Sequence, residues 1–139
     1  MDAVLDSNLS LRPISSRARW GSRLLTAVPA LFLFFDAAVK LADLPGVRQA
    51  CTRIGLPDHL IGTVAVVELA CLGLYLIPRT AVLGAVLLTG FLGGAVVVHL
   101  RLDDPLFTHV LFPVYVGALL WGGLFLRDAR VRALFSASP

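Results

Sequence analysis

The sequence has few charged residues and almost no lysine or glutamate. Only 15% of its 139 residues are charged and 58% are hydrophobic, whereas about a quarter of a soluble domain is charged. Its single lysine, Lys40, and its single glutamate, Glu68, both lie within apolar stretches. This composition excludes an ordinary soluble domain and indicates an integral membrane protein.

Cysteine is also scarce, and its spacing offers no metal site. Cys51 and Cys71 form no C-x-x-C pair, and because one is predicted in a connection and the other deep in a membrane span, we expect no disulfide between them. The sequence contains no phosphate-binding loop and no nucleophile motif. The net charge of +3 comes from arginines at the ends of apolar segments rather than from a patch interleaved with aromatics, so nucleic acid is not an expected partner.

Four apolar segments predict the fold. About 20 residues are needed to cross the hydrocarbon core of a bilayer, and the chain has room for four such helices with short connections. The segments comprise residues 24–42, 60–77, 81–100 and 106–126. We therefore predict an all-α fold, an integral membrane four-helix bundle over residues 24–126, with a weakly structured basic tail at 1–23 and a second basic tail at 127–139.

The connection between the first two spans, residues 43–59, has a pattern of its own. Between two breakers that contain proline and glycine, apolar residues recur at helical spacing: Val47, Ala50, Cys51 and Ile54. This pattern predicts a short amphipathic helix, which either lies on the membrane surface or caps the mouth of the bundle.

Arginine placement predicts the orientation in the membrane. The two tails and the turn at Arg79 together hold eight arginines, whereas the two opposite connections hold three. The positive-inside rule therefore places both termini in the cytoplasm. A cleaved secretory signal is the alternative for residues 24–35, but the apolar run continues to Ala42 and no convincing cleavage site follows it.

Ionisable residues gather in the predicted outer half of the spans. Asp36 and Lys40 lie one helical turn apart on the first span, Glu68 lies on the second, and His99 and His109 end the third and begin the fourth. A charge inside a membrane helix costs roughly 2.5 to 3.5 kcal/mol on insertion scales. These residues therefore predict a polar pocket that faces outward, with Lys40 against Glu68.

Each of these groups has a structural and a functional interpretation. Asp36 and Lys40 form either a self-neutralising ion pair or a handle for a proton or a substrate. Glu68 is either the partner of Lys40 across two helices or a general base that relays protons. His99 and His109 could ligate a metal or a haem, although interfacial histidines more often form hydrogen bonds, which disfavours that cofactor.

Two further groups concern packing. Cys71 and Tyr75 share the helical face of Glu68 and are predicted to line the same pocket. Gly90 and Gly94 form a G-x-x-x-G motif, which predicts that another helix backbone packs closely there.

The sequence resembles the DoxX-like family of small four-span bacterial membrane proteins over nearly the whole of residues 24–126. The resemblance is carried by FDAAVKL at 35–41, LP at 56–57, EL at 68–69, LYLIPR at 74–79, LGA at 83–85 and HL at 99–100. It implies a membrane bundle linked to quinone or thiosulfate oxidoreduction, in which Lys40, Glu68 and His99 occupy polar family positions. Asp36 stands where the family often has a small or neutral residue.

These observations lead to two functional hypotheses for a protein of the bacterial inner membrane. In the first, the outer pocket binds a quinone or a similar hydrophobic redox molecule; Lys40 and His99 polarise an oxygen and Glu68 shuttles the proton. The predicted binding residues are Asp36, Cys71, Tyr75 and His109. In the second, the chain is a non-enzymatic accessory subunit or assembly factor. Both place it in the lipid bilayer, with a membrane or redox protein as the expected partner.

Overall fold

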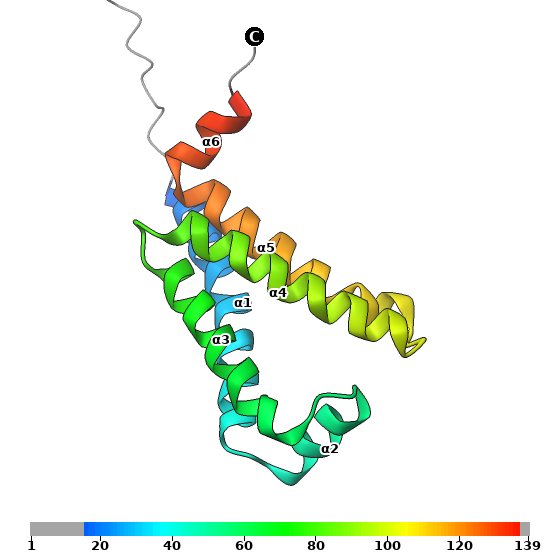
Figure 1. Ribbon diagram of the computed structural model, residues 1–139. Helices are drawn as coiled ribbons and strands as arrows, with labels where there is room; N and C mark the ends of the chain where they lie inside the picture. The colour runs from blue at the N-terminus through cyan, green and yellow to red at the C-terminus, as the bar shows by residue number, and fades with distance from the viewer. Residues whose placement is uncertain (1–15, 137–139) are drawn as a thin grey trace, which may run out of the picture.

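Helices make up nearly all of the computed structural model, which describes residues 16–136 and contains no strand in that range (Figure 1). In chain order they are α1 (Ser16–Leu41), α2 (Pro45–Arg53), α3 (Asp58–Leu76), α4 (Ala81–Arg101), the π-helical turn η1 (Leu106–Val110), α5 (Phe112–Arg127) and α6 (Ala129–Ser136). Four stretches are long and apolar enough to cross a membrane: Trp20–Leu41, Asp58–Leu76, Ala81–Arg101 and Leu106–Arg127. The predicted all-α fold with four spans is confirmed.

Both predicted tails are partly helical. α1 begins at Ser16 rather than at Leu24, so the first membrane helix extends through several basic residues. In the C-terminal tail, the Asp128 side chain accepts a hydrogen bond from the Arg130 backbone N–H at 2.8 Å, and α6 follows directly. Aspartate is a favoured residue at this capping position. The sequence carried this capping signal, and the prediction of a plain tail overlooked it.

The four long helices form a ring in which each contacts two others. α1 packs against α3 and α5, and α4 packs against the same two helices. In Figure 1 the α1–α3 and α4–α5 pairs lie together where α6 begins and spread apart toward α2. We call the first of these the closed end and the second the open end. The largest fully buried side chains include Tyr75, Leu88, Leu120 and Leu124, which lie toward the closed end.

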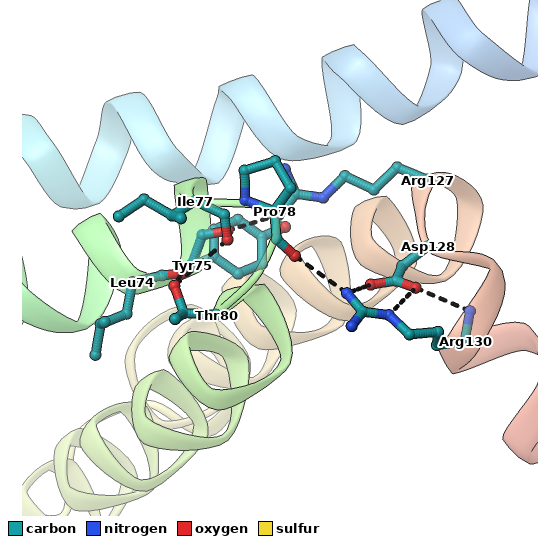
Figure 2. A network of polar contacts seen from close by, with 8 residues as sticks. All are labelled: Leu74, Tyr75, Ile77, Pro78, Thr80, Arg127, Asp128 and Arg130. Atoms are coloured by element: carbon teal, nitrogen blue, oxygen red, sulfur yellow. Dashed lines mark hydrogen bonds and ion pairs between the residues drawn. The ribbon is translucent and has the colours of Figure 1, made fainter.

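Hydrogen bonds fasten the closed end. The Tyr75 hydroxyl donates to the Leu120 carbonyl oxygen at 2.8 Å, which ties α3 to α5. Arg127 donates to the Tyr75 carbonyl oxygen at 2.7 Å, and Arg130 reaches the Pro78 carbonyl oxygen at 3.3 Å (Figure 2). One of the last carbonyls of α3 and one carbonyl of the α3–α4 turn, which lack helical partners, are thereby satisfied by arginines from the last two helices.

Glycine allows α3 and α4 to approach closely, but not at the predicted motif. A Cβ atom added at Gly84 would lie 2.1 Å from the Tyr75 backbone nitrogen, whereas one added at Gly90 or Gly94 would meet nothing within 4 Å. Within this chain, the prediction of close packing at Gly90 and Gly94 is wrong. The G-x-x-x-G pattern is only a spacing, and the helix crossing that needs glycine lies nearer the α3–α4 turn.

Replacing Gly84 with alanine should therefore destabilise the bundle, because the added methyl group collides with backbone that cannot move aside. We expect the free energy of unfolding to fall by at least about 1–3 kcal/mol. The matched change Gly90→Ala should stay within about 0.5 kcal/mol of the parent. Thermal unfolding in detergent measures both, and equal effects of the two changes would contradict the packing described here.

Candidate functional site

An ion cluster joins α1 and α3 in the open half of the bundle. The Lys40 ammonium donates hydrogen bonds to the Asp36 carboxylate, one turn earlier on α1, and to Glu68 Oε2 on α3 at 3.0 Å. The expected contact of Lys40 with Glu68 is therefore present. Lys40 also lies over the Phe91 ring of α4, with Nζ 6.0 Å from the ring centroid.

Glu68 is the most enclosed member of this cluster. The Glu68 side chain is 0% exposed, whereas the side chains of Lys40 and Asp36 are 15% and 36% exposed. Oε2 accepts the Lys40 hydrogen bond, but Oε1 is buried and has no hydrogen-bond partner among the described residues. An unpaired buried oxygen is costly, at about 1–3 kcal/mol or more for a charged group. Glu68 therefore offers a free acceptor to any ligand that reaches it.

A cavity of about 750 Å³ lies beside the cluster and draws its walls from α1, α2, α3, α4 and α5. Its apolar walls include Phe32, Phe91, Phe112, Pro113 and Val116. Its ionisable lining residues are Asp36, Lys40, Cys51, Glu68, His99 and Arg101. An apolar cavity with a few convergent polar groups is the usual form of a small-molecule site.

The helix α2 covers the open end of this cavity. Its apolar face, which includes Val47, Ala50 and Cys51, lines the cavity, and Cys51 is only 4% exposed. The sequence left open whether this helix lies on the membrane surface or caps the bundle. Its contacts correspond to the cap.

Polar contacts join α2, and Ile54 directly after it, to the end of α4 and the loop that follows α4. We call them the α2 latch: Arg101 donates to the Ile54 carbonyl oxygen at 2.7 Å, and Arg53 pairs with Asp104 at 2.8 Å. Gly55 has a φ of +79°, and a side chain there would come within 2.9 Å of the Arg101 guanidinium. Glycine thus provides both the left-handed turn and the space for Arg101.

His99 completes the latch. Its Nδ1 lies 2.7 Å from Asp104 Oδ2, so the same carboxylate holds His99 and Arg53. The hydrogen bond with His99, together with the charge of Arg53, lowers the pKa of Asp104. Asp104 is therefore charged at neutral pH, and the latch is lost only as the pH falls through this lowered pKa. Nε2 is the His99 nitrogen left for a ligand.

His109 lies next to His99 but outside the cavity lining. The two ring centroids are 5.8 Å apart, and His109 Nδ1 lies 2.9 Å from the Thr108 hydroxyl. Residues 16–136 contain no group of three or more His, Cys, Asp or Glu side chains arranged to hold a metal ion.

Cys71 and Tyr75 do not line the cavity. Both belong to the hydrophobic core, and Tyr75 is fully buried with its hydroxyl on α5. They share the face of Glu68 on α3, but Tyr75 lies two turns, about 10 Å, farther toward the closed end. A shared helical face specifies direction and not depth, so it could not indicate that Tyr75 lies beyond the cavity.

The polar and aromatic lining residues missed as site residues include three that sit opposite or above the ion cluster. Arg101 and Phe91 come from α4, and Cys51 comes from α2. The helical spacing of Cys51 with Val47 and Ala50 was the available signal for the cap. Nothing in the sequence signalled Arg101, because an arginine at the end of a span is usually read as a topology determinant.

A comparison with known families identifies a match over most of the chain. The model of the DoxX-like family matches residues 24–123. This range comprises all four spans except for the first few residues of the first span and the last few of the fourth. No curated protein and no solved structure matches the chain.

Breaking the α2 latch should expose the cavity. In a Cys71→Ser background, Cys51 is the only cysteine, and burial raises the pKa of its thiol, which slows alkylation. We expect the double change Arg53→Gln and Arg101→Gln to increase maleimide labelling of Cys51 by about fivefold or more, because each lost hydrogen bond contributes about 1 kcal/mol to the closed position.

The matched control is Arg48→Gln. Arg48 also lies on α2, but it pairs with Asp43, just before α2, and with Asp58, at the start of α3, rather than with α4 or the loop after it. Its loss should leave the labelling rate of Cys51 nearly unchanged. Equal labelling of both variants and the parent would show that the latch does not hold α2.

Proposed function

The chain belongs to the DoxX-like family of membrane proteins, and we propose that it binds a quinone or a similar hydrophobic redox molecule in the cavity beneath α2. The cavity volume of about 750 Å³ suits such a ligand, since small-molecule pockets range from about 300 to 1,000 Å³. Phe32 and Phe112 pack edge to face with centroids 5.1 Å apart, and with Phe91 they form aromatic walls for a flat ring.

The unpaired oxygen of Glu68 is the observation that carries this proposal. Lys40 uses two of its three N–H groups on Asp36 and Glu68, so one donor remains. A ligand with a carbonyl or hydroxyl oxygen can accept from Lys40, and one with a hydroxyl group can donate to Glu68 Oε1. Quinones provide the first pattern when oxidised and both patterns when partly or fully reduced.

The charge of the cluster supports a role in proton exchange. Lys40 is one cation between two carboxylates, so the fully ionised cluster carries one uncompensated negative charge. Glu68 is the carboxylate with a free oxygen, and it is the group we assign to take or give the ligand proton. Asp36 is more exposed and shares Lys40 with Glu68, which provides a route for that proton toward the open end.

The remaining predicted residues divide by position. His99 lines the cavity opposite the cluster and is the second candidate to polarise a ligand oxygen. Asp36 positions Lys40. His109 lies at the rim, and Cys71 and Tyr75 support the core rather than contact the ligand. In this proposal the chain binds the ligand and handles its protons, and a redox partner protein exchanges the electrons.

Quinone retention tests the proposal. The protein would be purified in mild detergent, offered ubiquinone and menaquinone, and analysed by mass spectrometry of the extracted ligand. We expect Glu68→Gln and Lys40→Met each to weaken retention by about tenfold or more, because each change removes a hydrogen bond with a charged partner. Thermal unfolding, measured alongside, verifies that both variants are folded.

His109→Gln is the matched control, since it changes a nearby polar residue that does not line the cavity. It should retain quinone like the parent. If the parent carries only phospholipid and binds neither quinone, the accessory-subunit hypothesis replaces this one. If both cluster variants retain quinone fully, the cluster does not bind it.

A further inference from the structure

A second cavity lies at the closed end of the bundle, away from the ion cluster. Its volume is about 570 Å³, and its walls come from the first half of α1 and from the last residues of α3 and α5. The lining residues are Ser22, Arg23, Thr26, Ala27, Leu76, Leu126 and Arg127. None of them lines the first cavity, and the proposed function does not use them.

Both charged residues of this cavity are arginines. Arg23 lies 5.8 Å from the centroid of the Trp20 ring, and it forms no ion pair with an acid among residues 16–136. Arg127 stacks over the Tyr75 ring at 4.6 Å and gives one N–H to the Tyr75 carbonyl oxygen. A guanidinium has five N–H donors, so most of the donors of Arg127 remain for a ligand.

Asp128, the acid next to Arg127 in the sequence, pairs with a different arginine, Arg130. Asp128 accepts hydrogen bonds from the backbone and side chain of Arg130, as Figure 2 shows. Burial raises the pKa of Asp128, but these hydrogen bonds outweigh the burial and lower it. Asp128 therefore stays charged in its pair with Arg130, and it is not among the residues that line the cavity.

Polar and apolar groups of the cavity are arranged for an amphipathic anion. Ser22 and Thr26 lie on the α1 wall with their side chains buried, and the Ser22 hydroxyl donates to the Gly123 carbonyl oxygen at 3.4 Å. Ala27, Leu76 and Leu126 supply apolar surface beside the arginines. Two arginines beside an apolar wall together match a phosphate that carries hydrocarbon.

We propose that this cavity binds the phosphate group of an anionic membrane phospholipid. Its residues lie at the ends of the spans Trp20–Leu41, Asp58–Leu76 and Leu106–Arg127, which is the depth at which lipid headgroups lie. Trp20, 65% exposed, marks the same interface. Arg23 and Arg127 bind the phosphate oxygens, and the acyl chain follows Leu76 and Leu126 toward the hydrocarbon core.

The test is native mass spectrometry of the full chain released from nanodiscs that contain equal amounts of phosphatidylglycerol and phosphatidylcholine. We expect the parent to retain phosphatidylglycerol selectively. Arg23→Gln should reduce that selectivity about fivefold, since an arginine near an anionic surface contributes about 1 kcal/mol, which is a factor of about five in affinity. Combining it with Arg127→Gln should remove the selectivity.

Arg79→Gln is the matched control, because Arg79 is an exposed arginine at the same end that does not line the cavity. It should retain the parent's selectivity. An equal loss in Arg79→Gln, or no loss in Arg23→Gln, would overturn the proposal in favour of general surface charge. Arg23→Gln alone decides the question if the double variant fails to fold, because Arg127 also fastens α3.

A second measurement separates a lipid from a soluble anion. Inorganic phosphate would be titrated against the delipidated protein, and thermal stabilisation would be followed. We expect phosphatidylglycerol in mixed micelles to stabilise the parent at a mole fraction where phosphate does nothing. Stabilisation by phosphate alone that is lost in Arg23→Gln would identify a soluble phosphate as the ligand and overturn the assignment to lipid.

Discussion

The structure depends on how a carboxylate is accommodated inside an apolar bundle. Removing an ion from water costs several kcal/mol even after the protein relaxes, and Glu68 meets that cost with one hydrogen bond from Lys40. Lys40 in turn needs Asp36, one turn away on its own helix. The three residues make α1 and α3 a fixed pair at this depth, and they leave one Glu68 oxygen unmatched.

The open and closed ends of the bundle differ in how tightly the helices pack. At the closed end, Tyr75 and Leu124 fill the space between helices, and the backbone of α3 meets Gly84 directly. At the open end the helix pairs spread, α2 covers the gap, and Arg101 fastens the far side to Ile54. The tightly packed half gives the open half a rigid base, so the cavity survives without side chains filling it.

The sequence predicted the fold well and the site in part. The four membrane-spanning helices follow from the length of the apolar segments. The pairing of Lys40 with Glu68 follows because each isolated charge in a membrane needs a partner. The depth of a side chain along the bundle was harder to predict, because Tyr75 shares a helical face with Glu68 yet belongs to the core. The contact of Arg101 with Ile54 across the open end could not be predicted from the sequence. It depends on how far the two helix pairs spread apart, which local sequence patterns do not encode.

We propose that Lys40 and Glu68 form the polar wall of a ligand cavity rather than a purely structural ion pair. An experimental structure of the protein in lipid, prepared with added quinone, would decide between these roles. We expect ligand density in the cavity beneath α2, with an oxygen at hydrogen-bond distance, about 2.7–3.2 Å, from Lys40 Nζ or Glu68 Oε1. A structure in which Lys40 points at lipid, or in which side chains fill the cavity, would contradict it.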